Sequence, residues 1–228
     1  MQLLPEDKLI WSPIVANSRM NRERNSSGIN SYEKEFKFNP EKYLELKIKE
    51  SGSASWIDLC CGLGNALQQT AAYLFDKGLR QNIILKGIDL LDSNRPDNEK
   101  NDWISFDVGS VVNWIPDQHY DLITCVHGIH YLGDKLKVIE TAMGALSPQG
   151  MFIANLDLSS IVIEEADTAF LLKERFKQAQ VEYNSRTRII KRTGNAAINF
   201  GVSYIGADDS TGPNYTGQDA VTSFYSLK

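Results

Sequence analysis

Cysteine is scarce in this chain of 228 residues, which contains only three. Cys60 and Cys61 are neighbours, and Cys125 stands alone. A small, odd number of cysteines argues against a disulfide framework and for a reducing compartment. Zinc sites use paired Cys-x-x-Cys or Cys/His spacing, and His127, two residues after Cys125, has no second pair to complete such a site. We therefore predict no metal and expect the protein to be cytoplasmic.

Long apolar runs and an excess of positive charge are missing as well. No run approaches the ~20 residues of a membrane helix. The start, MQLLPEDKLIW, lacks the basic and then apolar pattern of a secretory signal. A formal net charge of −5 gives the chain no overall attraction to a polyphosphate. We expect neither nucleic acid nor a membrane as a partner, and the sequence gives no sign of the oligomeric state.

What the chain does contain is a regular alternation of strand and helix patterns. Apolar residues at helical spacing follow the first β-rich run, beginning at Leu67, and recur over residues 132–146 and 163–181. Such alternation is typical of an α/β protein with a parallel sheet covered by helices on both faces, a three-layer sandwich. The β-rich runs lie at residues 55–60, 82–89, 103–108, 119–126 and 151–156.

The two ends of the chain differ from this pattern. Residues 186–192 and 198–205 flank the turn signal Thr193-Gly194-Asn195 and predict an antiparallel hairpin at the end of the sheet. Residues 1–50 are polar and weakly patterned, with a helix expected at 40–49. We therefore divide the chain into an N-terminal helical arm or lid, 1–50, and a main domain, 51–228.

The stretch WIDLCCGLGNAL, residues 56–67, places a glycine turn between a strand and a helix. Such turns bind adenosine cofactors, because glycine lets the backbone approach the ligand and the helix N-terminus supplies N–H donors. The dinucleotide pattern needs a third glycine where Leu67 stands, and a carboxylate at Asp58 suits an ammonium group better than a pyrophosphate. A nicotinamide-dependent oxidoreductase is thus disfavoured. Asp89 is placed to bind ribose hydroxyls, and Asp107 to accept from an adenine amino group.

This stretch resembles motif I of the class I S-adenosylmethionine-dependent methyltransferases, read here as Asp58-Leu59-Cys60-Cys61-Gly62-Leu63-Gly64. Residues 120–132, YDLITCVHGIHYL, are similar to the fourth-strand motif of that family, and residues 146–152, LSPQGMF, to its turn before strand five. The resemblance covers about residues 55–157. Cys60 and Gln149 replace glycines that the family usually has, and the thiols of Cys60 and Cys61 are expected to be inert.

The resemblance implies a Rossmann-like fold with a mostly parallel, seven-stranded sheet. S-adenosylmethionine is the implied cofactor and S-adenosylhomocysteine the product. The implied cofactor-binding residues are Asp58, Cys60, Cys61, Gly62, Gly64, Asn65, Asp89, Leu90, Asp107, Val108 and Cys125.

Two histidines leave the fourth strand where the substrate side of this fold lies. His127 occupies a position that the family varies with substrate, and we predict it as a general base, with His130 as the second candidate. Each is alternatively a histidine that only supports the loop and the next helix. The candidate substrate-binding residues are Tyr131, Asn155, Asp157, Asp208, Tyr215 and Arg22. For several of them the alternative is simple packing or a solvated surface loop.

The class of acceptor follows by exclusion. The Asn/Asp-Pro-Pro-Tyr/Phe tetrad of enzymes that methylate adenine or glutamine is replaced by Cys125-Val126-His127-Gly128. No basic segment interleaved with aromatic residues suggests a nucleic acid. We predict methyl transfer to an oxygen or nitrogen of a small molecule. The alternatives are a methyltransferase acting on a protein or peptide side chain, and a module that binds the S-adenosyl ligand without catalysis.

Overall fold

The computed structural model describes residues 3–16, 23–90 and 103–228, which form a seven-stranded sheet, a three-stranded sheet and flanking helices. The large sheet has the order β3-β2-β1-β4-β5-β8-β7. Its strands are β1 (Ala54–Leu59), β2 (Ile83–Asp89), β3 (Ile104–Val108), β4 (Tyr120–Cys125), β5 (Leu146–Asn155), β7 (Glu182–Asn184) and β8 (Ile189–Thr193). The first five are mutually parallel, whereas β8 runs antiparallel to both β5 and β7. The predicted fold class is confirmed.

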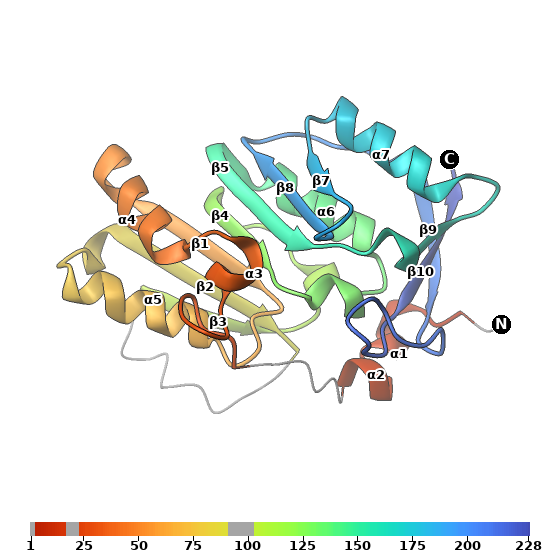
Figure 1. The fold of residues 1–228 in the computed structure, drawn as a ribbon, viewed down its shortest axis with the longest axis horizontal. Coiled ribbons are helices and arrows are strands. Elements are labelled where there is room, and N and C mark those ends of the chain that lie inside the picture. The colour runs from red at the N-terminus through yellow and green to blue at the C-terminus, as the bar shows by residue number, and fades with distance from the viewer. Residues whose placement is uncertain (1–2, 17–22, 91–102) are drawn as a thin grey trace.

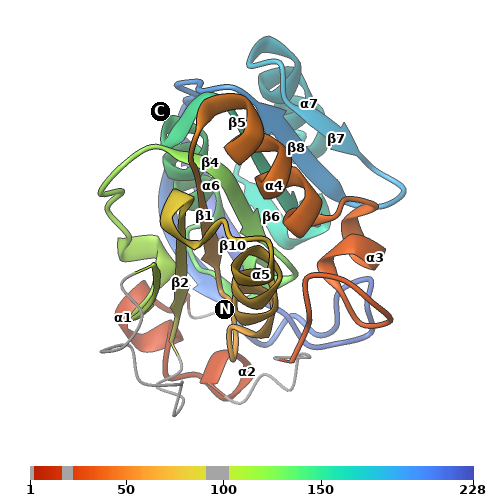
Figure 2. The same cartoon turned by 90° about the vertical axis from the view of Figure 1, so that its left-hand side faces the viewer.

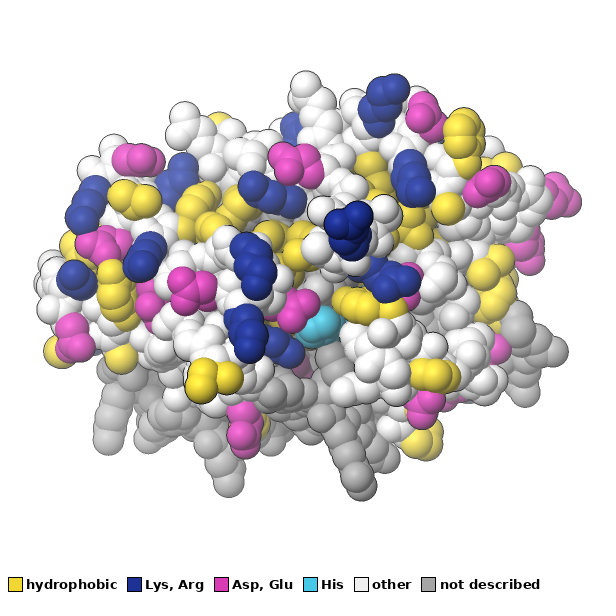
Figure 3. Space-filling view, viewed as in Figure 1, with side chains coloured by type: hydrophobic (Ala, Val, Ile, Leu, Met, Phe, Trp, Pro, Cys, Tyr) yellow, Lys and Arg dark blue, Asp and Glu magenta, His cyan; other side chains and the backbone are white. Residues whose placement is uncertain are grey.

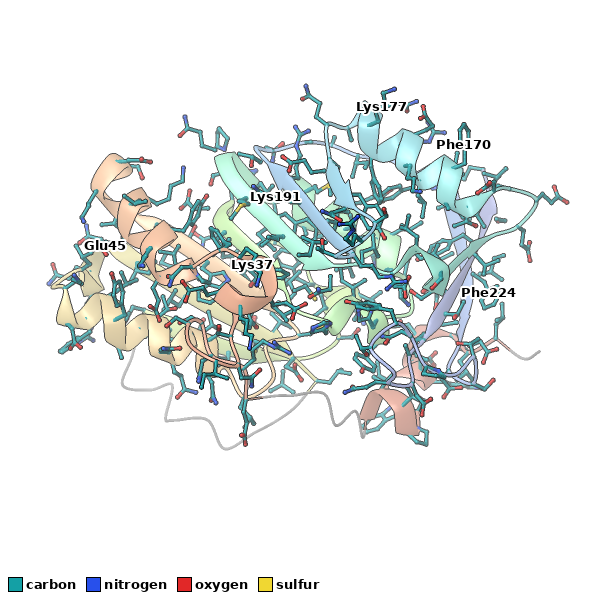
Figure 4. All side chains as sticks on the ribbon, in the orientation of Figure 1. Lys37, Glu45, Phe170, Lys177, Lys191 and Phe224 are labelled. Carbon is teal, nitrogen blue, oxygen red and sulfur yellow. The ribbon has the colours of Figure 1, made fainter. Side chains whose placement is uncertain are left out.

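Helices cover both faces of this sheet (Figures 1 and 2). On one face α4 (Pro40–Ser51) packs on β1, and α5 (Asn65–Asp76) packs on β2 and β3. On the other face α6 (Lys135–Gly144) packs on β5, and α7 (Thr168–Gln178) packs on β7. Figure 4 places Glu45 of α4 and Phe170 of α7 at opposite ends of the molecule. None of the helices in the described ranges is long and apolar enough to cross a membrane.

The sheet separates two hydrophobic cores because successive strand residues point to opposite faces. Trp56 of β1 joins the core under α4 and α5, and the next residue, Ile57, joins the core under α6 and α7. Leu122 and Ile123 of β4 divide in the same way. All six residues of β1 are buried, as expected of a central parallel strand that is covered on both faces. Two of the six, Ser55 and Asp58, are polar.

The three-stranded sheet was not predicted, and the structure corrects one predicted strand pairing and the predicted start of one helix. β10 (Thr222–Leu227) pairs in parallel with β6 (Ile161–Ile163) and antiparallel with β9 (Val202–Asp208). The predicted partner of residues 186–192, at 198–205, is therefore wrong, because those residues contribute to β9, and β8 pairs instead with β7. The helix expected from residue 163 begins only at Thr168, where the Asp167 side chain caps it by accepting the Phe170 N–H.

The N-terminal region packs against the rest of the chain. α1 (Glu6–Leu9) contacts β9, and the Leu4 and Ala207 backbones exchange two hydrogen bonds of 2.7 and 3.0 Å. α2 (Pro13–Ala16) follows, and α3 (Tyr32–Phe36) begins at Ser31, whose side chain accepts the Lys34 N–H. α4, which the sequence places in the N-terminal arm, packs on β1 and α5. The division at residue 50 stays a prediction.

Candidate active site

A cleft opens at the carboxyl ends of β1, β2 and β4, and the N-terminal region closes one side of it. The open volume within it is about 920 Å³, counting the part that is exposed to solvent. Its wall contains residues of the glycine turn and of the loop after β4, together with residues of α1, α2 and α3. The main lining residues are Glu6, Leu9, Ile10, Val15, Arg24, Tyr32, Cys60, Cys61, Gly62, Asp89, Leu90, Gly109, Val126, His127 and Tyr131.

The glycine turn is fixed by its own backbone and by one carboxylate. The Cys61 N–H donates to the Ile88 carbonyl at 3.1 Å, which ties the turn to β2. Gly62 has φ 59°, a conformation that glycine adopts without strain. Its N–H donates to Asp89 Oδ2 at 2.8 Å, so the Asp89 carboxylate is held in one orientation at the wall of the cleft. α5 begins directly after this turn.

The two neighbouring cysteines fill spaces left by glycines on adjacent strands and loops. Cys60 has φ 59°, in the left-handed region that favours glycine. A Cβ on Gly128 would lie 2.3 Å from Cys60 Cβ, and a Cβ on Gly87 would lie 2.7 Å from Cys61 Sγ. The neighbouring Cys125 thiol and burial raise the pKa of Cys60 well above its usual range, so its thiol stays protonated at neutral pH.

Asp58 lies behind the cleft wall rather than in it. Its side chain is fully buried and accepts the Tyr32 hydroxyl at 2.6 Å and the Thr124 hydroxyl at 2.5 Å. Burial raises the pKa of Asp58 to about 7, although both hydrogen bonds oppose that shift. Tyr32, not Asp58, lines the cleft. The predicted contact between Asp58 and the cofactor ammonium stays a prediction.

The other predicted cofactor residues divide between the wall and its surroundings. Leu90 lines the cleft, whereas Cys125 is fully buried at the end of β4. Asp107 forms an ion pair of 3.0 Å with Lys86, and Val108 is 57% exposed. Gly64 and Asn65 belong to the start of α5. Among these six, the structure brings only Leu90 into the cleft lining.

His127 is the centre of a buried polar network. It has φ 57° and is 7% exposed. Its Nε2 lies 3.3 Å from Glu35 Oε1, and its backbone N–H donates to Asn155 Oδ1 at 3.1 Å. Asn155 Nδ2 donates to the same Glu35 oxygen at 2.9 Å. The hydrogen bond from His127 lowers the pKa of Glu35 to about 2, so this carboxylate is ionised at neutral pH.

His130 lies beside this network without joining it. Its ring centroid is 5.8 Å from that of His127 and 5.5 Å from that of Tyr215. The side chain is fully buried, and neither ring nitrogen has a partner among the described residues. Burial lowers the pKa of His130 to about 3, so the ring is neutral and weakly basic at pH 7. These features favour the packing role over the catalytic one.

The remaining predicted substrate residues lie in three places. Tyr215 and Asp157 share Arg188, whose guanidinium stacks 4.3 Å from the Tyr215 ring centroid while its Nε lies 3.3 Å from Asp157 Oδ1. Tyr131 lines the cleft, and its hydroxyl donates to Gln218 Oε1 at 3.3 Å. Asp208 caps a turn by accepting from the Ser210 N–H and hydroxyl.

Of the predicted substrate residues that the structure describes, only Tyr131 belongs to the cleft lining. Asn155 is fully buried behind His127, and Arg22 lies outside the described residues. Arg24, two residues further on, lines the cleft and lies 3.6 Å from Glu35. Figure 3 shows histidine on this face with acidic and basic side chains gathered around it, and Figure 4 places Lys37, which follows α3, on the same face.

The residues that sequence reasoning missed include three with polar side chains, Glu6, Tyr32 and Glu35. All three lie in the N-terminal region, where the pattern is weak. The start of α3 carries one local signal, since Ser31 before a charged, apolar-flanked pentapeptide is a typical N-cap. That signal predicts a helix, but it does not reveal that Tyr32 reaches Asp58 or that Glu35 reaches His127.

Comparison with known families identifies the family of this chain. A family model described as a methyltransferase domain matches residues 31–191, well over half of the chain. The chain therefore belongs to the class I, Rossmann-like methyltransferases, and S-adenosylmethionine is the cofactor of that family. The residues present fit this cofactor, because the glycine turn and the fixed Asp89 carboxylate line one cleft. A search of curated proteins finds no match.

Several solved structures are similar in fold. The N-methyltransferase NodS from Bradyrhizobium japonicum WM9 in complex with S-adenosylhomocysteine is 12% identical, with a TM-score of 0.43 over 83% of this chain and 95% of NodS. The plantazolicin methyltransferase BpumL is 19% identical, with a TM-score of 0.41 over 53% of this chain and 46% of that one. PKMT2 from Rickettsia typhi is 19% identical, with a TM-score of 0.37 over 45% of this chain. This chain spans 20% of PKMT2 and 46% of BpumL, less than half of each.

Proposed function

We propose that this protein transfers a methyl group from S-adenosylmethionine to an oxygen or nitrogen of a small molecule. One observation carries the proposal: a single cleft is lined by the glycine turn, by Asp89 and by His127. A cofactor bound by the glycine turn and Asp89 would therefore lie next to His127. We extend the proposal to a cytoplasmic location, on the cysteine usage described above.

The bound cofactor supplies an electrophilic methyl group: the acceptor–carbon bond forms as the carbon–sulfur bond breaks, and the bonding pair stays on sulfur to give S-adenosylhomocysteine. The residues of the chain hold the reactants and manage the proton. Asp89 and the backbone of Gly62 would hold the cofactor, with the Asp89 carboxylate as the acceptor for its ribose hydroxyls. His127 takes the proton that the acceptor loses, and a positioned base of this kind contributes about 100-fold or more.

The walls of the cleft favour a small acceptor. Its lining includes Leu9 of α1, Ile10 directly after that helix and Val15 of α2, together with residues that follow β4. Arg24 and Tyr131 complete the wall near His127. A peptide needs an open groove, whereas these elements surround a cleft. Methylation of a protein or peptide side chain and binding without catalysis remain the two alternatives, and an acceptor screen distinguishes them.

Calorimetric titration with S-adenosylmethionine, S-adenosylhomocysteine and NAD tests the proposal. We expect both S-adenosyl ligands to bind with micromolar affinity, about −8 kcal/mol, and NAD not to bind. Asp89→Ala removes the carboxylate that holds Gly62 and faces the cleft, and should weaken binding at least ~10-fold, about 1.4 kcal/mol. The matched control is Asp76→Ala at the exposed end of α5. Binding of NAD alone would overturn the proposal.

A further inference from the structure

The backbone at His127 is held in an unusual conformation by a side chain from the neighbouring strand. A φ of 57° lies in the left-handed region and has a free-energy cost for a residue with a Cβ. Asn155, at the end of β5, offsets this cost because its Oδ1 accepts the His127 N–H at 3.1 Å. Strain of this kind collects at functional sites. Here it turns the imidazole toward Glu35 of the N-terminal region.

The contact between His127 and Glu35 decides which ring nitrogen carries the proton. Nε2 lies 3.3 Å from Glu35 Oε1. A carboxylate oxygen only accepts, so a stable contact at this distance needs a proton on Nε2. In the neutral ring Nδ1 is then the nitrogen with the free lone pair. Nδ1 is buried and has no hydrogen-bond partner among the described residues, an arrangement that costs free energy unless a ligand supplies a donor.

Glu35 is itself held from three sides. Asn155 Nδ2 donates to Oε1 at 2.9 Å, so one amide fixes both the carboxylate and the His127 backbone. Arg24 lies 3.6 Å from Oε2 and keeps a positive charge beside the ionised group. The loop before α3 is anchored as well, since the Ser26 N–H donates to Gln69 Oε1 on α5 at 2.9 Å. Glu35 therefore has a fixed position although it comes from a distant part of the chain.

We propose that Glu35 and Asn155 are positioning residues that hold His127 as the Nε2–H tautomer, which leaves Nδ1 to take a proton from a hydroxyl or ammonium acceptor. This inference rests on the proposed function and narrows it to acceptors that carry a removable proton. A hydroxyl acceptor gives its proton to Nδ1 as its oxygen bonds to carbon, whereas an ammonium acceptor gives its proton to Nδ1 first, because only the freed lone pair can form the bond. In both cases the carbon–sulfur bond breaks with its electron pair left on sulfur. The charge that appears on the imidazole faces the Glu35 carboxylate.

Nitrogen-15 NMR of the imidazole rings tests the assignment in the free protein. The chain has only three histidines, so His127→Gln, His130→Gln and His119→Gln identify each signal. At pH 7.5 to 8 we expect the His127 signals to show a protonated Nε2 and an unprotonated Nδ1. Glu35→Gln keeps an acceptor and should retain this tautomer. Glu35→Ala and Asn155→Ala should give mixed tautomers, and Glu33→Ala, on the same helix, should not.

A protonated Nδ1 in the unmodified protein would overturn the inference at once, even if the alanine variants fail to fold. An unchanged tautomer in a folded Glu35→Ala protein would overturn it equally. The measurement needs neither cofactor nor acceptor. Its result is therefore independent of the calorimetric test, which decides whether the cleft binds S-adenosyl ligands at all.

Discussion

At the residue scale, the glycine turn departs at Cys60 from the motif that it resembles. Cys60 takes a left-handed conformation that suits glycine, and its side chain occupies space that Gly128 leaves empty. The side chain of Cys60, directly after β1, thus occupies the space that a side chain at position 128, after β4, would need. The two positions should behave as a coupled pair in stability measurements.

Gly128→Ala tests this coupling. The new Cβ would lie 2.3 Å from Cys60 Cβ and 2.7 Å from its Sγ, so we expect a loss of about 1–3 kcal/mol in the free energy of unfolding, as for overpacked cores. When Gly128→Ala is made in the Cys60→Gly protein, the loss of unfolding free energy should be smaller by more than about 1 kcal/mol. Urea unfolding of the unmodified protein, the two single variants and the double variant measures this difference. Gly144→Ala, where a Cβ meets nothing within 4 Å, is the control. Equal losses in both backgrounds would rule out the coupling.

The sequence predicted the part of the site that is local in the chain. Gly62, Asp89 and His127 each follow a buried strand, and the resemblance to a family named them before any geometry was known. Tyr32 and Glu35 were not found, because their contacts join residues 26 and 120 positions apart. A short helix with charged residues gives no sign of which distant strand it meets. Only tertiary packing shows that Glu35 lies against His127.

At the scale of elements, the predicted central strands and helices are present, and the differences lie in pairing. Residues 198–205 have a strand pattern, and part of them is a strand, but β9 pairs with β10 rather than β8. Alternation of apolar residues predicts which face is buried but not which strand is the neighbour. The tight turn responsible for the hairpin joins β7 to β8, and β7 has only three residues, too few to give a periodic signal.

α1 belongs to a small core of its own, which leads to a prediction about local unfolding. Leu9, Ala207 and Val221 form a cluster apart from the two cores of the main sheet. Leu9→Ala removes a side chain that is 1% exposed, a change that costs about 2–5 kcal/mol at such sites. We expect α1 to undock while the sheet stays folded, so hydrogen exchange at the Leu4 and Ala207 amides should accelerate.

In the same Leu9→Ala protein, the Ile57 amide of β1 should keep its protection, and S-adenosylmethionine should bind more weakly because Leu9 lines the cleft. Leu46→Ala on α4, where the side chain is 56% exposed, is the matched control and should change neither quantity. Uniform loss of protection across the large sheet would show instead that α1 and the main cores unfold as one unit.

At the scale of the whole molecule, two buried groups make opposing contributions to the pH dependence of stability. The pKa of Asp58 is raised to about 7, so the native state binds more protons than the unfolded state between about pH 4 and pH 7. The pKa of His130 is lowered to about 3, so the native state binds fewer protons between about pH 3 and pH 6.5. In weakly acidic solution their contributions to the slope of the unfolding free energy against pH nearly cancel. Replacing one of the two residues should therefore make the contribution of the other measurable.

His130→Leu should therefore make the protein more resistant to acid. His130 is fully buried, so its contribution is present above pH 6.5 and is lost as the pH falls toward 3, because only the unfolded state then gains a proton at this residue. Relative to pH 7.5, the unfolding free energy of the unmodified protein should fall below that of the variant by about 1 kcal/mol per pH unit between pH 6 and pH 4. Urea titrations across this range measure the difference. The control is His119→Gln, at an exposed position before β4. Its unfolding free energy should depend on pH in the same way as that of the unmodified protein. If the unfolding free energy of His130→Leu has the same pH dependence as that of the unmodified protein, the imidazole takes up its proton in the folded state as it does in the unfolded state. The neutral, packing role assigned to His130 would then be wrong.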